Sequence, residues 1–89
     1  MEGDDEDETY ELCEIACWRG YLTWQFFVES PLESSLASPY FRAPGKGVPE
    51  QTETSLAARA VLVEMLAAAG WEPEGDGEEW YAERFQRAG

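Results

Sequence analysis

The sequence predicts an α+β domain in which a small antiparallel sheet carries one helix packed on it. Residues 10–28 are rich in aromatic and β-branched residues on both sides of a glycine, as is typical of a hairpin. Residues 56–69 repeat apolar positions at helical spacing and end at Gly70. An aromatic segment over residues 79–86 then closes the domain. Together these segments predict an N-terminal hairpin, one helix and a C-terminal strand.

The predicted hairpin turns at Arg19 and Gly20, because glycine tolerates the positive φ that tight turns require. Side chains alternate along a strand, and cross-strand partners share a face. The predicted pairs are Cys17 with Leu22, Ile15 with Trp24, and Cys13 with Phe26. A shift of one residue would divide these apolar side chains between two faces, so we expect their common face to lie in the core.

Residues 29–49 contain four of the five prolines and are predicted to be mainly loop. A short third strand over Ser38–Ala43 is compatible with the pattern. Pro39 would place that strand at a sheet edge, because proline has no N–H to donate to a neighbour.

The helix is predicted to start at Thr52 or Thr54, either of which can cap it. Gly70 suits a left-handed stop, and Trp71 can fold back onto Leu66 as in a Schellman motif. The predicted apolar stripe consists of Leu56, Ala60, Val63 and Ala67, with Leu62, Leu66 and Ala69 beside it.

Residues 79–86 fit two structures. As a strand they would place Tyr81 and Phe85 on one face. As a helix they would follow Asp76 and Glu79, which resemble a capping box. Aromatic content favours the strand and local propensity favours the helix, so the residues alone leave both open.

The formal net charge of −13 argues against binding to phosphate, and therefore against a nucleic-acid partner. Residues 1–9 are predicted to be a disordered acidic leader, and residues 10–89 a single domain. No apolar run approaches the ~20 residues that span a bilayer, and an acidic N-terminus is unlike a signal peptide. We therefore expect no membrane association and a cytoplasmic location.

Cys13 and Cys17 are the only cysteines. On one strand they would lie about 13 Å apart, too far for a disulfide, so we expect buried reduced thiols. The sequence contains no histidine, the usual general base and a frequent metal ligand. Lys46 lies between two glycines, where desolvation is difficult. We therefore predict that the chain is not an enzyme, with no catalytic residues, no metal site and no cofactor.

Residues 72–83 have some features of an EF-hand calcium loop. Counted from Glu72, acids occupy the first, third, fifth and twelfth positions and Gly77 the sixth. The first and third positions carry glutamate instead of aspartate, and Pro73 stiffens the second. Calcium binding is therefore an alternative, and a helix stop followed by a glycine-rich turn is the favoured interpretation.

The second face of the hairpin is also apolar, with Leu12, Ala16, Trp18, Tyr21 and Phe27. An antiparallel sheet usually turns a polar face to water, so this face predicts either an interface or a cover supplied by residues 29–49. Our leading hypothesis is a non-enzymatic protein-interaction or self-association module, such as a homodimer. Its candidate interface residues are Leu12, Trp18, Tyr21 and Phe27. A second hypothesis is an acidic nucleic-acid mimic that binds a basic partner.

The segments CEIACWRGY, SPYFR and GWEPEGDGEEWYAERFQR resemble a family of small uncharacterised proteins of high-GC bacteria. The shared pattern is CEI-x-x-WRGY, SP-x-FR and GWEP-x-G-x-G-x-x-WY-x-x-RF, over most of residues 12–87. The resemblance implies a fold of a few strands and one helix. It favours a strand over residues 79–86 and assigns no functional residues.

Overall fold

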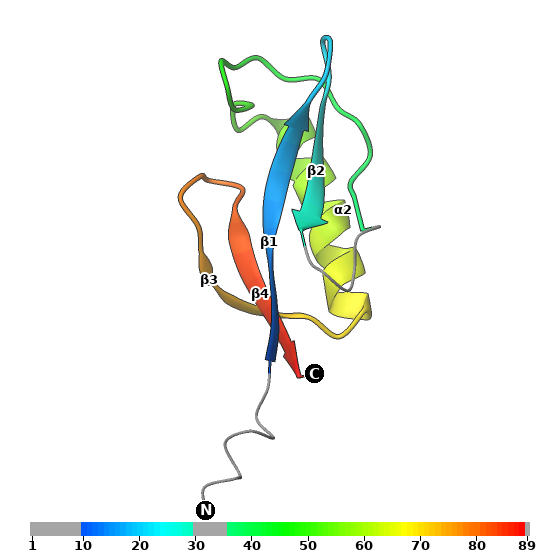
Figure 1. The fold of residues 1–89 in the computed structure, drawn as a ribbon. Coiled ribbons are helices and arrows are strands. Elements are labelled where there is room, and N and C mark those ends of the chain that lie inside the picture. The colour runs from blue at the N-terminus through cyan, green and yellow to red at the C-terminus, as the bar shows by residue number, and fades with distance from the viewer. Residues whose placement is uncertain (1–9, 30–35, 89) are drawn as a thin grey trace, which may run out of the picture.

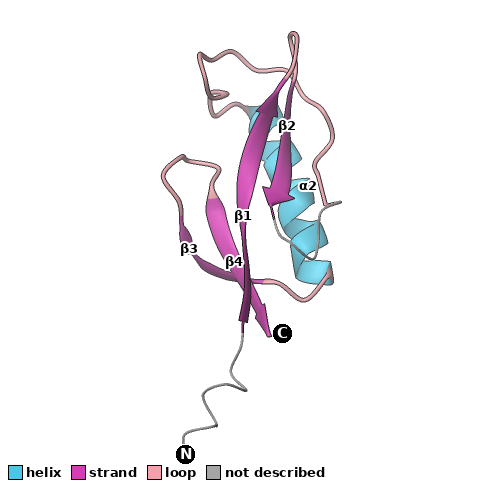
Figure 2. Ribbon diagram, viewed as in Figure 1, coloured by secondary structure: helices cyan, strands magenta, loops and turns pink. Residues whose placement is uncertain are grey.

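The computed structural model describes residues 10–29 and 36–88, and the predicted leader over residues 1–9 lies outside them. Within these ranges the elements are β1 (Tyr10–Arg19), β2 (Trp24–Glu29), α2 (Glu53–Ala68), β3 (Glu72–Asp76) and β4 (Glu83–Ala88). The strands form an antiparallel sheet in the order β2-β1-β4-β3, and α2 lies against one face of it (Figures 1 and 2). The predicted α+β class is confirmed.

The hairpin forms, but its predicted register is wrong. The observed pairs are Arg19 with Trp24, Cys17 with Phe26, and Ile15 with Val28. The turn runs over Gly20–Thr23, closed by a 2.8 Å hydrogen bond from the Gly20 N–H to the Thr23 carbonyl. Leu22 is therefore exposed in the turn, with a φ of 68°. The residue opposite Cys17 is Phe26 instead of the predicted Leu22. The shift keeps the alternation, so the predicted face is still the buried one.

Residues 36–43 run along the outer edge of β2 instead of folding over the second face. Trp24 and Phe41 exchange two backbone hydrogen bonds, of 2.8 and 3.0 Å, and the Ser38 N–H donates to the Phe26 carbonyl. The contacts amount to isolated bridges, of Trp24 with Phe41 and Phe27 with Ala37, instead of the predicted third strand. Pro39 is exposed along this edge.

The helix begins at its Thr52 cap, which forms a capping box with Ser55. It ends in a Schellman motif: Gly70 has a φ of 92°, and the Trp71 N–H donates to the Leu66 carbonyl at 3.0 Å. Both ends agree with the sequence prediction. No helix among residues 10–29 and 36–88 is long and apolar enough to cross a membrane.

The predicted apolar face of the helix is confirmed only in part. Leu62 and Leu66 are buried, but the buried face is rotated by about one residue from the predicted central stripe. Leu56 is 47% exposed. The side chains that face the sheet are Ser55, Ala58, Leu62 and Leu66. Ser55 can be fully buried because its hydroxyl donates to the Glu50 carbonyl at 2.8 Å and accepts from the Thr52 N–H. Hydrogen bonds at the helix cap thus allow a polar side chain to be buried in the core.

The C-terminal segment forms a strand, as the resemblance implies, but later than predicted, over Glu83–Ala88. Trp80 and Tyr81 lie in the turn before it. The sequence prediction missed β3, where Glu72–Asp76 was interpreted as a turn. Among the described residues this strand pairs only with β4, its side chains are largely exposed, and its register is interrupted between Pro73 and Gly75. An edge strand tolerates proline and charge in this way.

Phe26 lies at the centre of the aromatic core, between the sheet and α2. Its ring centroid is 4.9 Å from that of Phe41, 5.1 Å from that of Tyr81 and 5.7 Å from that of Trp80. The Trp80 indole N–H donates to the Pro49 carbonyl at 2.8 Å. The β3–β4 turn and the segment before α2 are therefore joined through this core.

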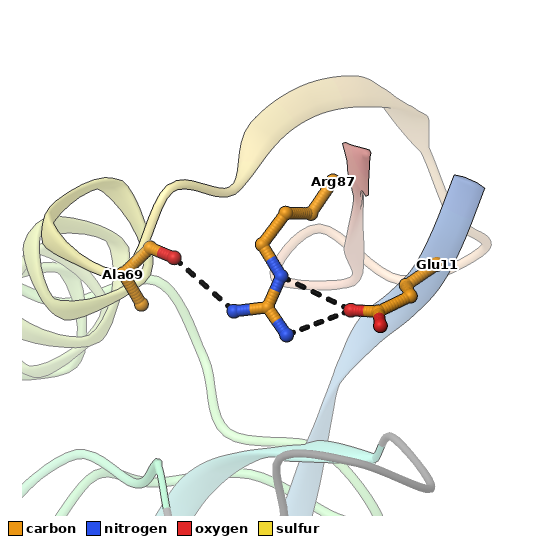
Figure 3. A network of polar contacts seen from close by, with 3 residues as sticks. All are labelled: Glu11, Ala69 and Arg87. Atoms are coloured by element: carbon orange, nitrogen blue, oxygen red, sulfur yellow. Dashed lines mark hydrogen bonds and ion pairs between the residues drawn. The ribbon is translucent and has the colours of Figure 1, made fainter. Parts of the chain in front are cut away.

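Arg87 ties the lower end of the sheet to the end of the helix (Figure 3). Its guanidinium donates to Glu11 Oε1 at 2.7 and 3.0 Å and to the Ala69 carbonyl at 3.1 Å. The guanidinium carbon lies 4.4 Å from the centroid of the Trp71 ring. One side chain on β4 therefore contacts β1, the C-cap of α2 and the buried tryptophan.

We expect Arg87→Ala to lower the free energy of unfolding by about 2–3 kcal/mol, because it leaves a half-buried carboxylate and a helix carbonyl without their donor. Arg84→Ala is the matched control. Arg84 is half exposed and meets Glu74 at 3.5 Å, so its removal should cost at most about 0.5–1 kcal/mol. Urea unfolding of both variants measures the difference, and equal losses would refute the role given to Arg87.

Candidate functional site

The open face of the sheet, opposite α2, carries the side chains that alternate with the core residues. Leu12 and Trp18 are 60% and 47% exposed, and Phe27 is half-buried. Glu14 and Ala16 lie between Leu12 and Trp18 on β1. This face is therefore apolar toward the β1–β2 turn, and Leu12 is separated from that region by a carboxylate.

An aromatic patch, consisting of Trp18, Phe27 and Tyr40, lies on this open face. The Trp18 and Tyr40 rings meet edge to face, with centroids 5.9 Å apart and planes at 70°. Phe27 is the diagonal neighbour of Trp18 in the β1–β2 register, a spacing of about 7–8 Å between Cα atoms. The Trp18 ring also lies over Gly20, where an added Cβ would approach its Cη2 within 2.3 Å. Gly20 thus leaves room for this ring position.

The structure brings together two of the four candidate interface residues, Trp18 and Phe27. Leu12 lies farther along β1, opposite Gln86 of β4. Tyr21 lies in the turn and is 90% exposed. Tyr40 belongs to residues 29–49, which the sequence offered as one possible cover for this face, but Tyr40 is 64% exposed and extends the apolar surface. Neighbouring residues of an extended segment point to opposite faces, so placing Phe41 in the core would have placed Tyr40 outside.

A hollow of about 600 Å³ lies beside the β1–β2 turn, where two of the six basic residues, Arg19 and Arg42, approach Tyr21 and Leu22. The Arg19 guanidinium carbon is 5.7 Å from the centroid of the Trp24 ring. This end of the molecule therefore combines positive charge with exposed apolar side chains.

A cleft of about 720 Å³ lies between β1 and the β3–β4 turn. Ile15, Ala16 and Cys17 line one side, and residues 76–79 with Tyr81 line the other. Four exposed carboxylates and one exposed guanidinium border it: Glu14, Asp76, Glu78, Glu79 and Arg84. The cleft is therefore strongly acidic, and its β1 wall, apart from Glu14, consists of backbone and small or apolar side chains.

Cys17 and Tyr81 are the titratable groups toward the core side of this cleft. Burial raises the pKa of the Cys17 thiol from 9.0 to about 11, and a backbone hydrogen bond from Gln25 opposes the change. Burial also raises the pKa of Tyr81, with smaller contributions from negative charge at Cys17, Glu79 and Glu14. Both groups are thus neutral near pH 7. Neither cysteine is part of a disulfide, as predicted, but only Cys13 is fully buried.

The EF-hand interpretation of residues 72–83 does not fit the structure. These residues form β3, a turn and the first residue of β4, instead of one loop wound around an ion. Glu72 and Asp76 lie at opposite ends of β3. Among residues 10–29 and 36–88, no three or more Asp, Glu, Cys or His side chains come close enough to hold a metal ion.

Comparison with known protein families, curated proteins and solved structures finds no match for this chain. The resemblance to the family of small high-GC bacterial proteins therefore stays a prediction from the sequence pattern.

We expect Cys17 to react slowly with thiol reagents in the folded protein. The variant Cys13→Ala leaves Cys17 as the remaining cysteine. Near pH 8, a thiol with a pKa of about 11 is ionised roughly 100-fold less than one with a pKa of 9.0. Modification by a disulfide reagent should be slower in the native than in the urea-unfolded protein by about this factor. The native rate should rise steeply between pH 9 and 11, and equal native and unfolded rates would contradict the assigned burial.

Proposed function

We propose that this chain is a non-enzymatic protein-interaction or self-association module that uses the open face of its sheet. The observation that carries the proposal is the aromatic patch: Trp18 and Tyr40 pack against each other, yet are 47% and 64% exposed. Aromatic side chains supply large contact areas and often anchor interfaces. An apolar patch on the uncovered side of an antiparallel sheet is best explained by a partner surface.

The chemistry of the chain supports a non-enzymatic role. The sequence has no histidine, and the neutral Cys17 thiol is a weak nucleophile at physiological pH. Lys46 is exposed in a loop, which keeps its ammonium solvated. Reduced cysteines fit the cytoplasmic location expected from the sequence.

The acidic-mimic hypothesis is a second candidate, favoured by the carboxylates around the cleft beside β1. It differs from the first in its dependence on salt. Contacts between exposed charges weaken as salt is added, whereas burial of an aromatic patch does not.

We expect the full chain to associate in a manner that resists high salt, and Trp18→Ser and Phe27→Ser each to weaken this association by at least tenfold. Sedimentation over a range of protein concentrations, at low and high salt, measures both effects. Val61→Ser is the matched control, because Val61 is 42% exposed on the helix, on the other side of the molecule from the patch.

Circular dichroism should first show that each variant keeps its fold. If folded Trp18→Ser and Phe27→Ser proteins associate as the parent chain does, the open face is not the interface. If the association of the parent chain disappears at high salt, burial of the aromatic patch does not drive it and the open-face proposal is contradicted.

A further inference from the structure

The edge of β1 that faces β4 is only partly occupied. β1 pairs with β4 from Tyr10 to Glu14, and with β2 from Glu14 to Arg19. In the described residues, the second half of β1 therefore has a strand neighbour on one side only. The acidic cleft of about 720 Å³ lies along this unoccupied edge, and the β3–β4 turn diverges from β1 there (Figure 1).

The hydrogen-bonding direction of this edge follows from the ladder. Trp24 exchanges both of its backbone bonds with Phe41, so its N–H and C=O point away from β1. Its partner Arg19 therefore sits in a non-hydrogen-bonded pair, with its own N–H and C=O directed to the opposite side. By alternation, Cys17 points the same way. The backbone N–H and C=O groups of Cys17 and Arg19 thus point to the β4 side of β1, beyond the point where the pairing with β4 ends.

We infer that this edge binds an extended basic peptide, which adds to the sheet as a further strand. An unpaired strand edge is a template for such addition, in which backbone hydrogen bonds give affinity and side chains give specificity. The volume of the cleft falls within the range of about 300–1,000 Å³ that ligand pockets occupy. The inference concerns the edge of the sheet and goes beyond the proposed use of its open face.

The lining of the cleft specifies the charge of the peptide. Glu78 and Glu79 lie on the far wall and Glu14 at the β1 wall, so lysine or arginine side chains would meet carboxylates. A second copy of this chain is disfavoured on the same ground. Edge-to-edge pairing would bring two acidic walls together in a protein of net charge −13.

The alternation of β1 specifies the side-chain pattern of the peptide. A strand added beside Cys17 would point alternate side chains toward the core side, where Tyr81 and Cys17 line the cleft. The intervening side chains would point to the open side, toward water and Glu14. A peptide that alternates apolar and basic residues therefore fits this edge.

The test uses the capped peptide acetyl-Lys-Val-Lys-Val-Lys-Val-Lys-amide, titrated into the ¹⁵N-labelled full chain. We expect the largest amide shifts at Cys17 and Arg19 and slower hydrogen exchange at both amides. The same peptide N-methylated on alternate residues, made in both registers, keeps its charge but cannot complete the ladder. Each N-methylated form should bind at least tenfold more weakly. A glutamate-for-lysine peptide should not bind.

Matched charge variants separate the cleft from the overall charge. Glu78→Gln with Glu79→Gln should weaken binding of the lysine peptide roughly fivefold to tenfold, since two charge contacts are lost. Glu50→Gln with Glu64→Gln removes two carboxylates that do not line the cleft, and should change the affinity for the lysine peptide less than twofold.

Three results would overturn the inference: no binding of the lysine peptide, equal binding of the N-methylated peptides, or equal weakening by the two double variants. Phe27→Ser should leave the peptide affinity unchanged. Its effect on association is measured separately, so failure at the edge and failure at the open face can be distinguished.

Discussion

The divided pairing of β1 determines how the other elements of the molecule are arranged. One half of this strand pairs with β4 and the other half with β2, and Glu14 is paired on both sides. The sheet is therefore complete on both sides of β1 only near that residue. Among the described residues, β1 therefore lacks a strand neighbour beside residues 10–13 on the β2 side and beside residues 15–19 on the β4 side. Residues 36–43 run along the outer edge of β2.

Core packing explains why β4 does not continue along β1. A further extension of β4 toward its N-terminus would require Tyr81 to join the ladder opposite Cys17. Instead, Tyr81 packs its ring on Phe26, and its carbonyl accepts from the Glu83 N–H at 2.9 Å. Burial of such a ring contributes about 1.5–3 kcal/mol, whereas a ladder hydrogen bond at an edge contributes about 0.5–1.5 kcal/mol. Because burial of the ring stabilises the fold more, the chain leaves the sheet where Trp80 and Tyr81 turn to the core.

The placement of the aromatic residues also shapes the surfaces. The helix α2 covers one face of the sheet, and aromatic residues lie on both faces. Phe26 and Trp24 are buried in the core, while Trp18 and Tyr40 are exposed on the open face. The polar groups are arranged around this division: Arg87 closes the lower end of the core, and the carboxylates of the β3–β4 turn line the open edge. Several carboxylates of the chain thus lie beside the edge of β1 whose backbone N–H and C=O groups have no strand neighbour among the described residues.

Local signals predicted much of this fold. Thr52, Gly70 and Trp71 mark the helix ends because capping chemistry depends on adjacent residues, and the buried face of the hairpin follows from alternation alone. The alternation could not predict the strand register, because a longer turn that shifts the cross-strand partners by an even number of residues leaves the same side chains on the buried face. The helix face was predicted only in part: Leu62 and Leu66 are buried as expected, whereas the burial of Ser55 depends on its cap hydrogen bonds. The strand β3 was missed because its stability comes from pairing with β4 and not from the propensity of Glu72–Asp76.

The candidate surface was predicted in part: Trp18 and Phe27 lie on the open face, while the position of Tyr40 and the open edge of β1 depend on contacts between segments distant in the sequence.

Amide hydrogen exchange along β1, measured on the monomeric full chain, distinguishes an open edge from an occupied one. The divided pairing predicts protection at Cys13, which faces β4, and at Ala16, which faces β2. It predicts fast exchange at Cys17 and Arg19, whose N–H groups face the open edge. Protection of Cys17 equal to that of Cys13 would contradict the divided pairing, because it would mean that a strand or another segment occupies the edge assigned to a partner.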